Sequence, residues 1–164
     1  PPCKKALRKT AKKLTNKLSN SPADFSVLTV RWQDKEIELR KIRHQVFIVE
    51  QNVPFALEWD GLDEDAIHLL ALNPAGEAVG CARLLAGGKL GRMAVLADWR
   101  GKGVGESLLQ AAIAACRQQG WCSISLCAQT HAMGFYQRAG FVVCSEEYLD
   151  AGIAHRDMKL RLNN

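Results

Sequence analysis

The stretch Arg100-Gly101-Lys102-Gly103-Val104-Gly105 decides the fold, because it lies between a predicted strand and a predicted helix. The strand is LGRMAVL at residues 90–96. After the glycines, apolar residues recur at steps of about four and one, which is typical of one helix face: Val104, Leu108, Leu109, Ala112, Ile113 and Cys116. Glycines at a helix N-terminus leave backbone N–H groups free to bind an anion, so this stretch predicts a pyrophosphate-binding loop.

The spacing of the glycines narrows the choice of cofactor. The dinucleotide pattern G-x-G-x-x-G would need a glycine at position 106, which is Glu106. The triphosphate pattern fails as well, because the Gly88-Lys89 pair is followed by Leu90. What remains, [RQ]-x-x-G-x-[GA], resembles the coenzyme A pyrophosphate loop of the GNAT N-acyltransferase superfamily. The alternative is a plain strand-to-helix turn.

A second motif lies about thirty residues downstream. FYQRAGF at residues 135–141 joins a predicted short helix (131–139) to a predicted strand (140–148), and it resembles the aromatic-Tyr-x-x-x-Gly-Phe signature of that superfamily. Four further segments are similar to the ElaA-like branch of GNAT proteins: RHQVFIVEQNVP at 43–54, EWDG at 58–61, AIH at 66–68 and GIAHRDM at 152–158. The resemblance covers residues 27–162 and implies an N-acetyltransferase whose acceptor it leaves undefined.

The order of predicted elements indicates an α+β fold with a mixed central sheet flanked by helices, which is also what the resemblance implies. Turn residues separate the elements. We expect strands at 26–32, 66–72, 77–85, 90–96, 122–128, 140–148 and 153–160, and helices at 35–49, from 104 onward, and at 131–139.

Length and charge indicate one domain with a basic extension. At 164 residues the chain is long enough for one hydrophobic core, and we assign that domain to residues 25–164. Residues 1–24 hold seven basic residues and no acid before Asp24, so we expect a solvated, flexible extension. Without those seven, the 22 basic residues fall to 15 against 17 acidic ones, which argues against nucleic-acid binding by the domain. An amphipathic tether to anionic lipid or nucleic acid is the alternative for the extension.

Other chemistry finds little support in the sequence. No apolar run is long enough to span a bilayer. The six cysteines form no C-x-x-C pair and no metal-type spacing with histidine, so we expect no bound metal. Most cysteines fall on predicted core faces, and free cysteines suit a reducing cytoplasm, which is the location we expect.

The resemblance implies which residues hold acetyl-CoA. The N–H groups from Gly101 to Gly105 (Gly101, Lys102, Gly103, Val104 and Gly105) would bind the pyrophosphate, with positive charge added by Arg100 and Lys102. Backbone groups of Met93, Ala94 and Val95 would pair with the pantetheine amides, and one of their N–H groups would polarise the thioester carbonyl. Gln129 follows the neighbouring strand, where a contact with coenzyme A is expected.

The resemblance names a candidate proton donor but does not identify the general base. The resemblance places the hydroxyl of Tyr136 at the thioester sulfur as a proton donor, whereas a purely structural reading makes it a core aromatic. The strand at 90–96 offers no carboxylate, so the general base must come from elsewhere. The candidates are Glu50, Asp60 and His155, with Glu58 and His68 also considered, and proton removal through water is a further alternative.

These residues predict direct transfer of an acetyl group from acetyl-CoA to a primary amine of a small molecule or peptide, without a covalent intermediate. The acidic cluster at 58–65 predicts a rim that attracts a cationic amine, unless it is only a solvated turn. The competing hypothesis is a non-catalytic domain that binds or senses acyl-CoA. Self-association as a homodimer is left open.

Overall fold

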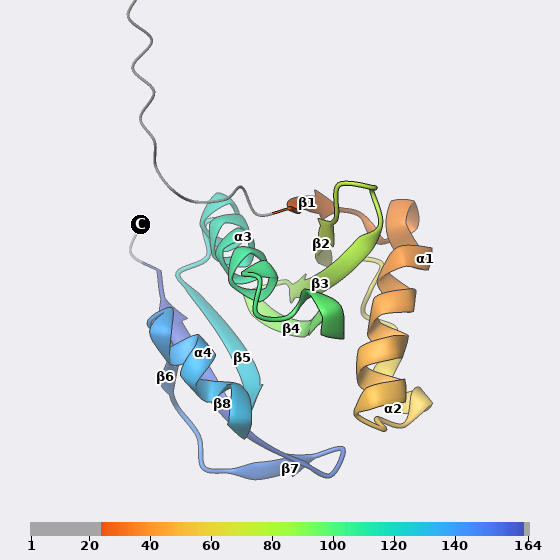
Figure 1. Ribbon diagram of the computed structural model, residues 1–164. Coiled ribbons are helices and arrows are strands. Elements are labelled where there is room, and N and C mark those ends of the chain that lie inside the picture. Colours follow the sequence, from red (N-terminus) through yellow and green to blue (C-terminus); the bar gives the residue numbers. More distant parts are fainter. Residues whose placement is uncertain (1–23, 163–164) are drawn as a thin grey trace, which may run out of the picture.

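The computed structural model describes residues 24–162. The protein folds into a mixed sheet with helices on both faces (Figure 1). The predicted α+β fold is therefore confirmed. The proposed extension at 1–24 lies outside the described residues except for Asp24. The strands are β1 (Ser26–Val30), β2 (Ile67–Leu72), β3 (Ala78–Leu85), β4 (Lys89–Val95), β5 (Ser123–Gln129), β6 (Val142–Val143), β7 (Tyr148–Asp150) and β8 (Ile153–Arg161).

Four α-helices connect these strands: α1 (Trp32–Arg43), α2 (Phe55–Glu58), α3 (Val104–Gln118) and α4 (Met133–Arg138). A π-helical segment, η1 (His44–Glu50), continues α1, and two 3₁₀ turns, η2 (Ala97–Trp99) and η3 (Thr130–Ala132), precede α3 and α4. None of the helices in the described part of the chain is long and apolar enough to cross a membrane.

The strand order is β1-β2-β3-β4-β5-β8-β6, with β7 paired to β8 as the arm of a hairpin. Every neighbouring pair is antiparallel except β4 and β5, which run parallel. Their pairing is limited to Lys89 with Ser125 and Leu90 with Leu126. Beyond these two pairs the strands diverge, which leaves the end of β4 without a strand partner on the side of β5.

Alternating side chains on the sheet form two apolar layers. On β2, Leu69 belongs to the cluster that includes Leu108 and Leu109 of α3, whereas Leu70 belongs to the cluster that includes Leu39 and Ile42 of α1. Thus α3 and α1 cover opposite faces of the sheet (Figure 1).

Helix α3 packs especially close to β3 at one glycine. A Cβ atom on Gly80 would lie 3.0 Å from Cγ1 of Val104 and 3.2 Å from the carbonyl oxygen of Ala94. A larger residue there would push the N-terminus of α3 away from the sheet. Gly80 therefore helps to fix where the glycine loop begins.

The first helix begins earlier and ends differently than predicted. Strand β1 ends at Val30, and α1 starts at Trp32, whose indole is buried against the sheet. From His44 the helix becomes π-helical, and the N–H of Gln51 donates to the carbonyl of Val46. Glu50 and Gln51, at the end of this π-helical segment, line the cleft described below.

The strand predicted at 140–148 is wrong as a single element. It is divided into β6 and β7, because Ser145 leaves the ladder. Its hydroxyl accepts a hydrogen bond from the N–H of Asp157 at 2.8 Å, replacing a backbone partner. The prediction about cysteines is also wrong in part: Cys81 and Cys116 are buried, but Cys122, Cys127 and Cys144 are exposed.

Candidate active site

The divergence of β4 and β5 opens a cleft of about 570 Å³. It runs along β4 from Val95 and Arg100 at one end to Lys89 and Gly91 at the other, with η1 and α2 on one wall and β5 and the β7–β8 hairpin on the opposite wall. Predicted site residues that line it are Glu50, Asp60, Met93, Ala94, Val95, Arg100, Gln129, Tyr136 and His155. The cleft thus gathers residues from nearly the whole length of the domain.

A β-bulge shapes the floor of the cleft. Cys81 pairs with Ala94 and Arg83 with Gly91, so two residues of β4, Arg92 and Met93, face a single residue of β3. Arg92 adopts a left-handed backbone conformation with φ of 49°. A bulge of this kind bends the strand and redirects its side chains. It therefore bends β4 at the point where its edge becomes free.

The glycine loop lies beside the cleft rather than in its lining. Gly101 and Gly103 have φ of 72° and 84°, and a Cβ atom on either would meet nothing within 4 Å. Within residues 24–162, no side chain caps the N-terminus of α3, so its first N–H groups can bind an anion. The loop therefore fits a pyrophosphate. Only backbone atoms of Val104 can take part, because its side chain is buried in the core.

Two side-chain bridges tie this end of the cleft together. Arg100 donates from Nε to the carbonyl of Val95 at 2.9 Å and pairs with the Glu50 carboxylate at 2.6 Å. Gln129 donates to the side-chain oxygen of Gln51 at 2.9 Å, across the cleft. Lys102 lies over the Trp99 ring, 5.0 Å from its centre. The carboxylate of Glu50 is consequently held by an arginine, which disfavours it as a base.

Tyr136 reaches the cleft from α4. Its hydroxyl lies 3.5 Å from the sulfur of Met93 on β4, and a thioether is a weak acceptor. Burial raises the pKa of Tyr136 to about 12. The hydroxyl therefore keeps its proton at neutral pH and makes no strong hydrogen bond that would hold it back.

His155 is oriented by a hydrogen bond within its own hairpin. Its Nδ1 lies 2.7 Å from the carbonyl oxygen of Ile153. A carbonyl can only accept, so Nδ1 carries the proton and Nε2 holds the free lone pair of the neutral ring. The ring stacks on Tyr148 with centres 6.1 Å apart, and the residue is 8% exposed. Nε2 is neither bonded nor sealed in among the described residues, which suits it to accept a proton from the cleft.

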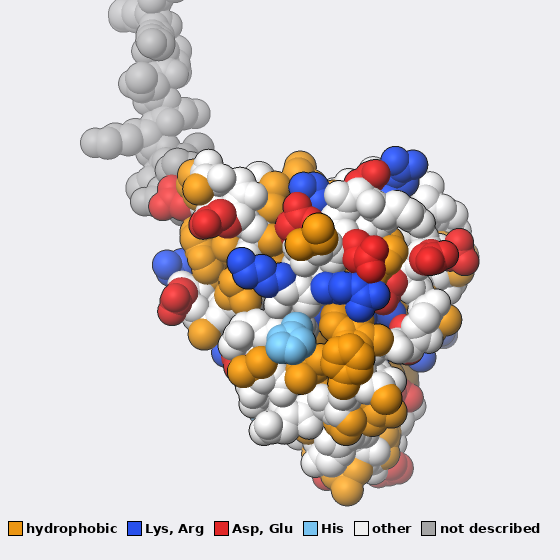
Figure 2. All heavy atoms as spheres, turned by 90° about the vertical axis from the view of Figure 1, so that its right-hand side faces the viewer, with side chains coloured by type: hydrophobic (Ala, Val, Ile, Leu, Met, Phe, Trp, Pro, Cys, Tyr) orange, Lys and Arg blue, Asp and Glu red, His pale blue; other side chains and the backbone are white. Residues whose placement is uncertain are grey.

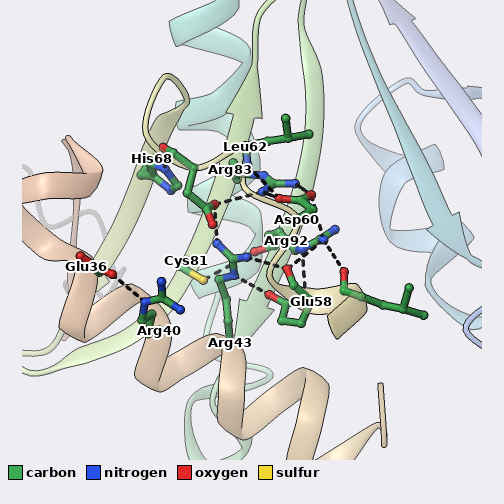
Figure 3. Close-up of polar contacts among 12 residues, drawn as sticks. Glu36, Arg40, Arg43, Glu58, Asp60, Leu62, His68, Cys81, Arg83 and Arg92 are labelled. Carbon is green, nitrogen blue, oxygen red and sulfur yellow. Dashed lines mark hydrogen bonds and ion pairs between the residues drawn. The ribbon is translucent and has the colours of Figure 1, made fainter. Parts of the chain in front are cut away.

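Three arginines and three acids form a network under the wall opposite the glycine loop (Figure 3). We call this set the arginine–carboxylate network; its members are Arg43, Glu58, Asp60, Asp63, Arg83 and Arg92. Arg43 lies 2.5 Å from Glu58 and 2.6 Å from Asp63, and Arg83 holds both oxygens of Asp60 at 2.7 Å. With three charges of each sign, the network is neutral.

The network changes the interpretation of the acidic cluster. Glu58 and Asp63 are buried, and Asp60 is bound by Arg83 and by the N–H of Leu62 at 3.1 Å. Hydrogen bonds from Arg83 hold the pKa of the Asp60 carboxyl well below its usual range. The prediction of an open acidic rim is therefore wrong for these three residues. As a fully ionised group between arginines, Asp60 is a weak base.

His68 does not belong to the cleft. It is 1% exposed, its Nε2 lies 2.8 Å from the carbonyl oxygen of Asp63, and its ring packs 5.4 Å from that of Trp32. Burial lowers the pKa of His68, so the ring stays neutral and holds the acidic segment in place. In the described part of the chain, no group of three or more His, Cys, Asp or Glu residues is placed to hold a metal ion.

The arginines of this network were not among the residues predicted for the site. Arg43 and Arg83 are 1% and 3% exposed, and Arg83 interrupts the otherwise apolar segment at residues 78–85. An arginine almost never lies in a core without a partner, so each of them predicts a buried carboxylate. That signal was present, but which acid each arginine would meet depends on the return of residues 58–63 across β3 and β4.

The fold and the cleft define an acyl-CoA-dependent N-acyltransferase, and comparisons with known proteins agree. The family model described as "Acetyltransferase (GNAT) domain" matches residues 33–162. The protein belongs to this family. Among relatives, the N-acetyltransferase YjcF of Bacillus subtilis is 40% identical over 122 residues, 71% of this chain and 86% of its own.

Solved structures resemble it as well. An acyl-CoA N-acyltransferase from Pseudomonas aeruginosa shares 32% identity at a TM-score of 0.71, covering 83% of this chain and 97% of its own. Escherichia coli ElaA shares 29% identity at a TM-score of 0.74, covering 82% and 98%. The resemblance to the GNAT superfamily and its ElaA-like branch is thereby confirmed.

Proposed function

We propose that the protein transfers an acetyl group from acetyl-CoA directly to a primary amine. One observation carries this: the phenol of Tyr136, which keeps its proton, and the imidazole of His155, whose Nδ1 is bonded to a carbonyl, line the same cleft. The glycine loop at the start of α3 lies next to one end of that cleft. These are the groups that acyl transfer to an amine requires.

The acyl donor is held from two sides. Free N–H groups at the start of α3 bind the pyrophosphate, each charge-assisted hydrogen bond contributing about 1.5–3 kcal/mol. The unpaired edge of β4 at Met93, Ala94 and Val95 offers backbone groups to the pantetheine amides. One N–H of this edge polarises the thioester carbonyl. Gln129 closes the opposite wall.

The acceptor must lose a proton before it can attack. Presenting an amine of pKa about 10.4 as the neutral form costs roughly 4–5 kcal/mol at pH 7. Nε2 of His155 accepts that proton as the amine nitrogen bonds to the thioester carbon. The carbon–sulfur bond then breaks, and Tyr136 donates its proton to the departing thiolate. A thiol of pKa near 8.5 needs only about 2 kcal/mol of help, so loss of the base is the more damaging.

Two substitutions test these roles through thiol release from acetyl-CoA in the presence of primary amines. We expect Tyr136→Phe to lower turnover roughly 10–100-fold and His155→Gln to lower it roughly 100-fold or more, with acetyl-CoA binding retained. The matched control is His131→Gln, because His131 also lines the cleft but has no hydrogen bond that sets its tautomer. Equal losses in both histidine variants would contradict the assignment of the base.

The same experiment separates an enzyme from a sensor. A sensor would bind acetyl-CoA and release no thiol with any amine, and neither Tyr136→Phe nor His155→Gln would alter that. Acceptor-dependent release from the wild type supports the enzyme. The orientation of His155 favours it too, because binding alone does not require a proton acceptor in the cleft.

A further inference from the structure

Part of the cleft wall formed by η1, α2 and the segment after them is lined by apolar side chains. Val53, Leu57 and Leu62, from the segment that follows η1, line the cleft together with Leu85 at the end of β3. Leu85 pairs with Lys89 and the carbonyl of Leu57 accepts from Arg92, so these two leucines lie toward the end of β4 that is remote from Arg100. The acceptor therefore meets this wall when the acyl donor occupies the end beside the glycine loop.

Two of these side chains are more exposed than leucines usually are. Leu57 is 54% and Leu62 is 52% exposed, although both line the cleft. Phe55 on α2 and Val49 on η1 are also exposed, at 65% and 53%, but neither lines the cleft. Figure 2 shows hydrophobic side chains gathered on the face formed by α1 and α2. Exposed apolar surface at the mouth of a cleft is stabilised when an apolar ligand covers it.

The carboxylates on the same wall are already paired with arginines. Glu58 and Asp60 both line the cleft, but Arg43, Arg83 and Arg92 of the arginine–carboxylate network occupy their oxygens (Figure 3). Beyond them, Glu50 is paired with Arg100. Asp150, on the opposite wall, and Lys89, at the end of β4, have no ion-pair partner among the described residues. A second positive charge on an acceptor would therefore find no free carboxylate on the leucine wall.

We propose that the acceptor is an amine with an apolar body, an alkyl or aryl group, which packs on Leu57 and Leu62. This inference rests on the proposed function and adds the class of substrate. The apolar body reaches the two leucines while the amine points along β4 toward Tyr136 and His155. The arginine–carboxylate network acts on this wall by holding it in place: Arg92 donates to the carbonyl groups of Leu57 and Glu58 at 3.2 and 3.1 Å.

The test compares kcat/KM, measured by thiol release from acetyl-CoA, for two groups of acceptors. Hexylamine and 2-phenylethylamine represent apolar amines, and 1,4-diaminobutane and spermidine represent amines with a second charge. We expect the apolar amines to be preferred at least tenfold. Leu57→Ser and Leu62→Ser should each reduce that preference about tenfold, because a pocket discriminates by about this factor for a lost apolar contact.

Phe55→Ser provides the matched control. Phe55 is exposed on the same helix as Leu57 but does not line the cleft, so its loss should leave the preference unchanged. A preference for the diamine or spermidine, or a preference for hexylamine that both leucine variants retain, would overturn the inference while leaving the acetyltransferase intact. Thiol release with none of these amines, nor with a broader amine panel, would instead overturn the proposed function itself.

Discussion

At the scale of single residues, ion pairs decide which acids are available for chemistry. Asp60 was a catalytic candidate by its place in the sequence, but Arg83 binds both of its oxygens. Since the pKa of Asp60 is lowered in the folded protein, the pair stabilises the fold above the unfolded pKa of about 4, and that stability is lost as pH falls below it.

We therefore expect Asp60→Asn to lower the free energy of unfolding at pH 7 by about 2 kcal/mol and to flatten its decline between pH 5 and 2. Urea unfolding at several pH values measures both. Glu36→Gln is the control, because Glu36 pairs with Arg40 on the surface, with both side chains 45% exposed, and such pairs contribute little. An Asp60→Asn variant with the wild-type pH dependence would show that the pair does not set acid stability.

Residue chemistry was predictable from sequence where it was local to a motif. Tyr136 follows from the FYQRAGF segment, and His155 from the GIAHRDM segment, and both reach the cleft. The choice of His155 over Asp60 was not predictable. It depends on Arg83, a residue of β3 that meets Asp60 only after the chain has turned twice.

At the scale of elements, the glycine loop and α3 formed as predicted, because turn, cap and helix periodicity are local signals. The π-helical end of the first helix and the division of residues 140–148 were missed. Both depend on distant partners: the packing of η1 beside β4, and the bond between Ser145 and Asp157 of β8.

The anion site at the start of α3 makes a prediction about charge. Gly103→Glu and Gly103→Gln share the same bulk and the same cost of a left-handed backbone. We expect the glutamate variant to bind acetyl-CoA about tenfold more weakly than the glutamine variant, because only it repels a pyrophosphate. Isothermal titration calorimetry measures the difference, which should shrink as salt is raised. Equal affinities of the two variants at low salt would show that this loop does not bind the pyrophosphate.

At the scale of the whole molecule, the sheet is interrupted between β4 and β5, where the cleft lies. Strands β4 and β5 pair at only two positions, whereas β5 and β8 pair from Ser123 to Gln129. The order of elements predicts neighbouring strands, but not that two of them separate. The bulge at Arg92 and Met93 lies just beyond the last β4–β5 pair, at Leu90.

If acyl-CoA binds as a substitute strand between β4 and β5, its binding should appear as local protection of the backbone. We expect saturating acetyl-CoA to slow hydrogen exchange at residues 93–95 and 126–129 several-fold more than in the rest of the sheet, because their amides gain partners or lose contact with water. The amides of β1 and β2, which are remote from the cleft, should change only by the general stabilisation of about 2.7 kcal/mol at 100 times Kd. Uniform slowing throughout the sheet, with no excess along the free edge of β4, would place the ligand elsewhere. Protection confined to residues 101–106 would mean that the glycine loop binds the pyrophosphate while the acyl chain stays outside the cleft, and Tyr136 would then have no thiolate to protonate.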